Sequence, residues 1–448
     1  MSVTTVAERR AAMVSGPLRD AIVHIALPSV AMALLQLVFL LTDTIWVGRI
    51  LGPDALAAVS TAGFAVWIVA ALAEMVATGL TALVARRHGE GAHGQAAVVS
   101  GTTLLLGLGI GIIVSVAGRL LVPALFAVMQ TPADVTGLGS RYLSTYLLGA
   151  PLVLGFFAVE ATFRASGDTR TPMAILGASV VVNLALDPLL ITGAGPLPRL
   201  GIAGAAVAAI LTRGAALALG YGLARRRGLV SLGVFDWRSG LAALRIGLPV
   251  AGTGVFFSLV YIGLTRITTR FGVPALAALG VGHKLEGLSY MAATGFGLAA
   301  AALVGQNLGA GRPDRARAAG WTTAWYAAGL GAIPAQAFVA FPEALVGIFT
   351  SDPAVVADGA MYLRAMAMAQ LSMGFEIVLE TALGGAGFTV IPMLCNGALT
   401  AARIPLAALL AGPFRVAGIW WTIGLTAVAR GVAMALLWRG DRWQRVRV

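Results

Sequence analysis

The chain has 448 residues, of which 58% are hydrophobic and 11% are charged, and its mean hydropathy is +0.89. Soluble domains carry roughly 25% charged residues, so this composition excludes a soluble globular fold. The formal net charge of +12 comes from arginines spread among short loops. They form no single basic face, which argues against binding to nucleic acid. The single cysteine, Cys395, excludes an internal disulfide and a cysteine-based metal site.

Apolar runs long enough to cross a bilayer as a helix, about 20 residues each, recur along the whole chain. They predict an all-α membrane protein with twelve transmembrane helices. The expected spans lie near residues 22–47, 56–83, 96–118, 138–160, 172–192, 201–223, 242–267, 276–304, 318–340, 360–382, 390–411 and 416–438. Residues 1–20 lack the short apolar core and cleavage site of a signal peptide, so we expect a retained cytoplasmic tail.

Basic residues are distributed unevenly between the loops. Most lie in the N-terminal tail, the even-numbered loops and the C-terminal tail, whereas odd-numbered loops hold few. Cytoplasmic loops of membrane proteins are enriched in Lys and Arg. We therefore expect a multi-pass protein of the plasma membrane with both termini in the cytoplasm.

The second half of the chain resembles the first. Residues 55–58 match residues 275–278, and Tyr142-Leu143 matches Tyr362-Leu363, both at an offset of 220 residues. Each half holds six spans, so both halves begin on the same side of the membrane and form parallel repeats. We expect an N-lobe of residues 1–224, a cytoplasmic linker of residues 225–240, a C-lobe of residues 241–448, and a central cleft as the substrate path.

An ionisable side chain inside a span is costly unless it faces a partner or a cavity, so each one is a functional candidate. Asp43 lies in the first span, with Gln36 two turns earlier, and Asn183 and Asp187 share one face of the fifth span. Both aspartates fall near the outer ends of spans that run outward, so we expect them at one depth.

Two neighbouring carboxylates in a low dielectric cannot both be ionised cheaply, which predicts a site that takes up a proton. The same carboxylate and amide oxygens could instead bind Na⁺. The alternative is purely structural, with Asp43 capping its span or pairing with Arg49 and with Asp187 in a turn.

Four glutamates are further candidates for a substrate site or a second cation site. Glu160 and its repeat mate Glu380 lie near the inner ends of their spans, where they either line the cytoplasmic mouth or pair with loop arginines. Glu376 lies one turn from Glu380 and deeper in the bilayer, which makes it the better candidate in the C-lobe. Glu74 is a similar but isolated case.

Several short motifs occur in a fixed order: Asp43-Thr44-Ile45-Trp46-Val47-Gly48-Arg49, Gly167-Asp168-Thr169-Arg170-Thr171-Pro172, Asn183-Leu184-Ala185-Leu186-Asp187-Pro188 and Gly305-Gln306-Asn307-Leu308-Gly309. In these motifs the chain resembles the multidrug and toxic compound extrusion (MATE) family, and most of all its DinF-like branch, from about Leu27 to Arg439. The resemblance implies two six-helix bundles, alternating access, and export of small amphipathic, often cationic compounds in exchange for H⁺ or Na⁺.

The resemblance also assigns an N-lobe cation site to five residues, namely Gln36, Asp43, Tyr142, Asn183 and Asp187. A threonine that the family pattern places in the sixth span corresponds here to Ala209. We therefore expect one oxygen of the pattern to be missing.

The sequence thus predicts a cation-coupled antiporter in which H⁺ is favoured over Na⁺, acting as a monomer in contact with membrane lipid and without a cofactor. The main alternative is a lipid-linked precursor flippase of the same superfamily, which would line its cleft with more positive charge. No catalytic motif and no Gly-Lys-Ser/Thr phosphate-binding loop is found, which argues against an enzyme and excludes ATP-driven pumping on this chain.

Overall fold

The computed structural model describes residues 6–129, 133–193, 198–350 and 352–446, and within these ranges the chain is almost entirely helical. Nine described helical segments are long and apolar enough to span a membrane, and the bent pair of α5 (Ala133–Leu148) and α6 (Ala150–Ala165) makes a tenth span. Residues 390–439 count once in that number, although a kink at Arg415 (φ 52°, ψ −137°) divides them into two spans. With α11 (Pro313–Ala340), the twelve expected spans all fall on helices.

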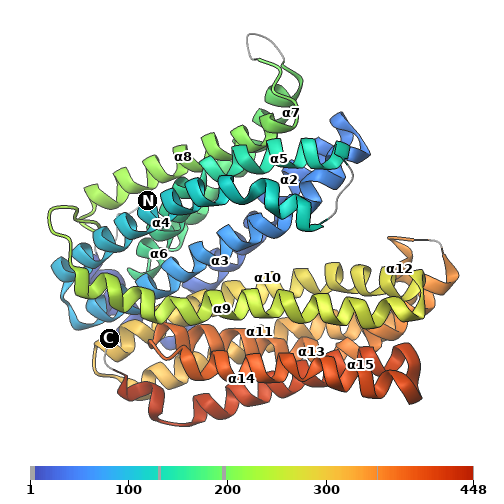
Figure 1. Ribbon diagram of the computed structural model, residues 1–448. Coiled ribbons are helices and arrows are strands. Elements are labelled where there is room, and N and C mark those ends of the chain that lie inside the picture. The colour runs from blue at the N-terminus through green and yellow to red at the C-terminus, as the bar shows by residue number, and fades with distance from the viewer. Residues whose placement is uncertain (1–5, 130–132, 194–197, 351, 447–448) are drawn as a thin grey trace. The chain divides into compact units, whose positions relative to one another are not determined.

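The first compact unit consists of residues 6–11 and the described part of residues 31–247. Within it, α6 packs against its neighbours α3, α4 and α8, and α7 packs against α8. The helices of this part of the chain are α1 (Val6–Val14), α2 (Leu18–Leu51), α3 (Pro53–Glu90), α4 (His93–Met129), α5, α6, α7 (Arg170–Thr192) and α8 (Ile202–Arg226), shown from blue to green in Figure 1.

The second unit consists of residues 12–30 and the described part of residues 248–446, so α1, α2 and α9 contribute to both units. Its central helix is α13, which packs against α10, α11 and α15. The helices are α9 (Trp237–Thr268), α10 (Val273–Gly309), α11, α12 (Pro342–Gly347), α13 (Pro353–Gly385), α14 (Val390–Ala401) and α15 (Arg403–Arg439). The expected lobe boundaries at residues 224 and 241 stay a prediction.

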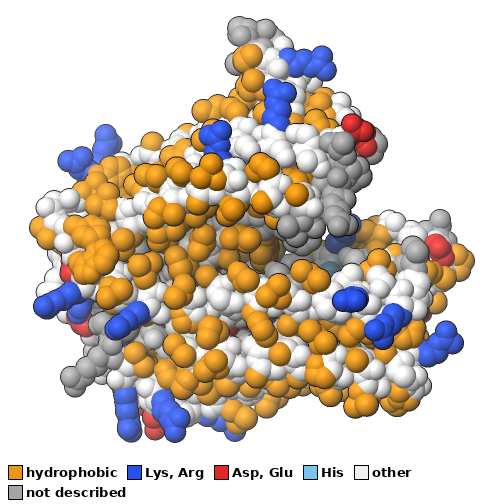
Figure 2. Space-filling view, in the orientation of Figure 1, with side chains coloured by type: hydrophobic (Ala, Val, Ile, Leu, Met, Phe, Trp, Pro, Cys, Tyr) orange, Lys and Arg blue, Asp and Glu red, His pale blue; other side chains and the backbone are white. Residues whose placement is uncertain are grey.

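The outward-facing side chains of the described helices are largely apolar. Ile113, Val181 and Leu409 are each about two-thirds exposed, at 66%, 68% and 69%. Figure 2 shows hydrophobic side chains along the flanks of the helices and most of the charged side chains near helix ends. Such exposure is favourable in lipid, where apolar side chains contact hydrocarbon and a helix bonds its backbone polar groups internally.

Two local features position α7 and the fourth span. Asp168 accepts hydrogen bonds from the backbone N–H (3.0 Å) and the hydroxyl (2.7 Å) of Thr171 at the start of α7. Asp168 also pairs with Arg227 at 2.5 Å, just beyond α8. Gly149 separates α5 from α6 at a bend of 48°, and a Cβ there would lie 2.5 Å from Cγ1 of Ile210 on α8. These contacts fix α5, α6 and α7 against α8.

Small residues set the close crossing of α11 and α13, which leads to a packing prediction. A Cβ on Gly374 would lie 2.5 Å from the backbone N of Ala328, whereas a Cβ on Gly329 would meet nothing within 4 Å. We expect Gly374→Ala to destabilise the protein by about 1–3 kcal/mol through overpacking. The matched Gly329→Ala variant should be neutral or slightly stabilised, since alanine favours the helix.

Thermal unfolding of both variants in detergent, followed by tryptophan fluorescence, checks this prediction. The unfolding midpoint should fall for Gly374→Ala only. Equal midpoints for the two variants would contradict the described crossing.

Candidate functional site

Two aspartates that are far apart in the sequence meet inside the first unit. The Nδ2 group of Asn183 donates to Oδ1 of Asp43 at 3.0 Å and to Oδ2 of Asp187 at 2.9 Å. Asp43 is 7% exposed, and Asn183 and Asp187 are fully buried. We call Asp43 and Asp187 the carboxylate pair. A single amide group therefore joins α2 to α7 through two acids.

The local structure of α7 explains half of this arrangement. Asn183 and Asp187 are four residues apart and so lie on one face of the helix. Pro188 follows within the same helix and has no N–H to offer Leu184, so the backbone is already irregular beside the acid. Gly193 ends α7 in the left-handed conformation (φ +76°), and its N–H donates to the Leu189 carbonyl at 2.9 Å.

The two carboxyl groups accept from the same amide group and interact electrostatically with each other, and Oδ1 of Asp187 is buried without a hydrogen-bond partner. Such a contact is favourable only when one of the two groups carries a proton, because two carboxylates repel in a low dielectric. The geometry thus suits a pair that shares one proton.

The orientation of the Asn183 amide is set by α8. The hydroxyl of Thr212 lies 3.1 Å from Oδ1 of Asn183 and 2.8 Å from the Ala208 carbonyl. Ala209 has no side-chain oxygen, as expected, but the same face of α8 carries a hydroxyl three residues later. Thr212 supplies one, because residues three apart share a helix face. Its hydroxyl contacts the amide and not the carboxylates.

Gln36 contacts a buried arginine that the sequence analysis missed. Nη2 of Arg213 donates to Oε1 of Gln36 at 3.0 Å. The guanidinium lies over the rings of Phe39 and Phe156, with Cζ 4.0 and 5.1 Å from their centroids. The sequence feature that could have identified it is a lone arginine within the apolar run of residues 202–223. It was overlooked because basic residues were assigned to loops.

Tyr142, the remaining candidate from the sequence, lies on α5 and is 4% exposed. It stacks on Tyr146 with ring centroids 6.2 Å apart, and it interacts electrostatically with Asp43 and Asp187. The structure thus brings Tyr142, Asp43, Asn183 and Asp187 into one neighbourhood, while Gln36 joins it through Arg213.

The glutamates of the first unit lie in a different environment. Oε1 of Glu160 accepts from Nη1 of Arg164 at 2.7 Å, an ion pair one helical turn apart on α6. Glu74 on α3 interacts electrostatically with both of these groups. Of the two predicted alternatives for Glu160, pairing with an arginine is the one found. The partner lies on the same helix.

The two candidate glutamates of the second unit also have polar partners. Glu376 pairs with Arg430 at 3.1 Å, and Glu380 accepts from Nδ2 of Asn396 at 2.7 Å. The position that repeats Asn183 is Arg403, whose Nε donates to the hydroxyl of Thr426 at 2.8 Å. The positions that repeat Asp43 and Asp187 are Gly263 and Ala407, which carry no acid. The acid–amide–acid motif is therefore not repeated at this position.

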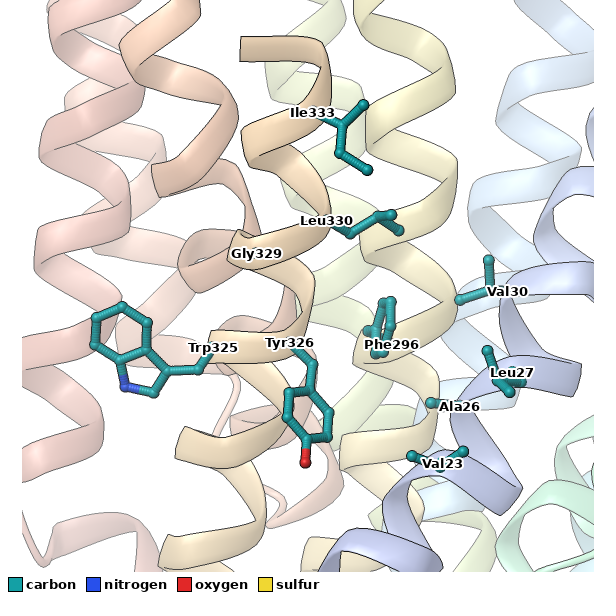
Figure 3. Close-up of a pocket in the computed structure, with 10 residues that line it drawn as sticks. All are labelled: Val23, Ala26, Leu27, Val30, Phe296, Trp325, Tyr326, Gly329, Leu330 and Ile333. Carbon is teal, nitrogen blue, oxygen red and sulfur yellow. The ribbon is translucent and has the colours of Figure 1, made fainter. Parts of the chain in front are cut away.

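A pocket of about 500 Å³ in the second unit is lined by apolar and aromatic residues of α2, α10 and α11. Figure 3 shows Val23, Ala26, Leu27 and Val30 on one side and Trp325, Tyr326, Leu330 and Ile333 on the other, with Phe296 between them. None of the lining residues carries a carboxyl group. This pocket therefore lacks the chemistry needed for ion coupling.

The chain matches the MatE family model over residues 28–189 and 249–409. It is 28% identical to a protein of Shewanella oneidensis named "FAD transporter", over 95% of each chain. It is 30% identical to the "Probable multidrug resistance protein NorM" of Pseudomonas aeruginosa, over 94% of this chain and 90% of that one. Its fold matches a crystal structure of a mutant of the Vibrio cholerae MATE transporter VcmN with a TM-score of 0.89, at 21% identity, over 95% and 98% of the two chains.

The carboxylate pair gives a stability prediction. Asn183→Ala removes the donor to two buried acids, which should cost about 1–3 kcal/mol. The loss should be largest at alkaline pH, where both acids are ionised, and should shrink at acidic pH, where a proton relieves their repulsion.

Thermal unfolding in detergent over a pH series measures this effect. Ser179→Ala, one turn earlier on α7, is the matched control because its hydroxyl only bonds back to the Ile175 carbonyl at 3.0 Å. A pH-independent loss in Asn183→Ala would count against a shared proton.

Proposed function

We propose that this chain, which belongs to the MatE family of membrane transporters, is a proton-coupled antiporter that exports small amphipathic organic cations. Membership makes it a multi-pass membrane transporter and not an enzyme. The coupling ion and the cargo are the parts that we propose. The observation that carries the proposal is the acid–amide–acid contact of Asp43, Asn183 and Asp187.

The direction of the Asn183 amide favours H⁺ over Na⁺. Its NH₂ group points at both carboxylates, and its oxygen accepts from Thr212. A sodium ion between the acids would need oxygen lone pairs aimed at it, whereas here it would face N–H hydrogens. A proton needs only one carboxyl oxygen, and Oδ1 of Asp187 has no other partner.

Exchange follows from competition for the same negative charge. With one proton bound, the pair can stay in contact and α2 can stay packed against α7. When that proton leaves, two buried negative charges repel each other, which favours a rearrangement of these helices and the binding of an organic cation. A proton arriving from the outside would restore the contact and expel the cargo.

The names of the relatives support a small organic cargo, but they refer to chemically different compounds. Several are named multidrug resistance proteins, and one is named "FAD transporter". The acidic pair inside the first unit favours cationic cargo, since opposite charges attract strongly in a low dielectric. Because one relative is named "FAD transporter", FAD is the second cargo to test. We also propose cytoplasmic termini, on the basis of the arginine-rich tail and even-numbered loops.

We expect Asp43→Asn and Asp187→Asn to abolish proton-driven efflux of a fluorescent organic cation from proteoliposomes. Each variant removes one titratable group while keeping the side-chain shape, so the remaining acid cannot share a proton. Glu343→Gln, in an exposed ion pair with Arg364, is the matched control and should transport like the wild type.

The assay applies a pH gradient and a Na⁺ gradient separately, with the dye and with FAD as cargo. Efflux driven by Na⁺ alone in the wild type would reject proton coupling. Full proton-driven efflux in both aspartate variants would reject the site.

A further inference from the structure

Arg213 is a buried cation beside the carboxylate pair that the proposed cycle does not use. It is 4% exposed, and its hydrogen bond goes to an amide oxygen, that of Gln36. Its Nη1 atom is buried without a hydrogen-bond partner. A guanidinium stays charged even when buried, because it is the strongest base among the side chains. The first unit therefore holds a fixed positive charge inside an apolar span.

The acidic groups that face Arg213 come from three helices. They are Asp43 on α2, Tyr146 on α5 and Glu160 on α6. Glu160 is already paired with Arg164, and a tyrosine hydroxyl is neutral at physiological pH. The carboxylate pair, contacted also by Asn183 and approached by Tyr142, is thus the negative charge left for Arg213 to compensate.

We propose that Arg213 is the fixed counter-cation of the carboxylate pair, and that its presence lets one proton neutralise the pair while excluding a sodium ion. This inference rests on the proposed proton-coupled function. Two ionised carboxylates and one guanidinium carry a net charge of minus one, which a single proton cancels. Without Arg213 the net charge would be minus two, and one bound proton would leave a buried charge, which is unfavourable.

The hydrogen bond between Arg213 and Gln36 also makes the Gln36 side-chain oxygen unavailable to a bound cation. Gln36 is one of the residues that the family resemblance assigns to cation binding, yet its Oε1 atom accepts from Nη2 of Arg213. A sodium ion near this oxygen would also lie against the guanidinium, which repels it. Arg213 and Thr212 are neighbours on α8. This one helix therefore orients both amide side chains of the site, those of Gln36 and Asn183.

The phenyl rings hold the guanidinium away from a direct ion pair. The ring of Phe39 lies 4.0 Å from Cζ and that of Phe156 lies 5.1 Å away, which stabilises the cation through the faces of the rings. Arg213 therefore acts on the pair through its field, without occupying the carboxylate oxygens. It is a positioning residue, and its loss should alter the proton and ion dependence of transport.

The test compares Arg213→Gln and Arg213→Lys in proteoliposome efflux of a fluorescent organic cation over a pH series. Removing the positive charge strengthens proton binding by the carboxylate pair, so the midpoint for Arg213→Gln should move to higher pH by about one unit or more. Arg213→Lys keeps the charge and should stay near the wild-type midpoint. A Na⁺ gradient should stimulate efflux by Arg213→Gln and not by the wild type.

Arg403→Gln removes a buried arginine of the second unit, whose Nε donates to the Thr426 hydroxyl, and controls for general effects of losing such a residue. Arg213→Met, which can fill the space between the two phenyl rings without charge, replaces Arg213→Gln if the latter does not fold. An uncharged variant with the wild-type pH profile and no response to Na⁺ would overturn the inference.

Asp43→Asn is measured in parallel to separate the two proposals. Lost coupling in Asp43→Asn together with an unchanged Arg213→Gln profile would overturn the role of Arg213 and leave the proton site standing. Coupled efflux that survives in Asp43→Asn would overturn the proton site and, with it, the role of Arg213.

Discussion

The proposed coupling depends on one buried amide that donates to two acids. Asn183 bridges Asp43 and Asp187 where no bulk water can stabilise a second negative charge. In such surroundings the protonation of one carboxyl group changes the energy of the α2–α7 contact far more than it would at a wet surface. A single proton can therefore bias two helices of the first unit.

The surrounding helices position the side chains that bridge Asp43 and Asp187. Asp168 accepts from Thr171 in the first turn of α7 and pairs with Arg227, so the start of α7 is held near the end of α8. Thr212 then fixes which way the Asn183 amide faces, and Arg213 fixes Gln36. Because these partners are specified by α8, the chemistry of the carboxylate pair depends on packing against a helix that carries no acid itself.

Much of this could be predicted from the sequence, and the reasons differ between features. Apolar run length identified all twelve spans, and the spacing of Asn183 and Asp187 placed them on one face of a helix. The meeting of Asp43 with Asp187 followed from span direction and from the family resemblance. Arg213 was missed because its partners lie on other helices, whereas the kink at Arg415 falls at the break that the sequence predicted between residues 411 and 416. The pairing of Glu376 with Arg430 likewise joins separate helices and cannot be read from spacing.

The central claim is that the carboxylate pair holds one exchangeable proton in competition with cargo. Proton release on cargo binding tests it most directly, with purified protein in weakly buffered detergent solution and a pH indicator that does not bind to the protein. The account predicts release of about one proton per chain on saturation with an organic cation, and none from Asp43→Asn or Asp187→Asn. Cargo binding without proton release by the wild type, or undiminished release by both variants, would contradict it.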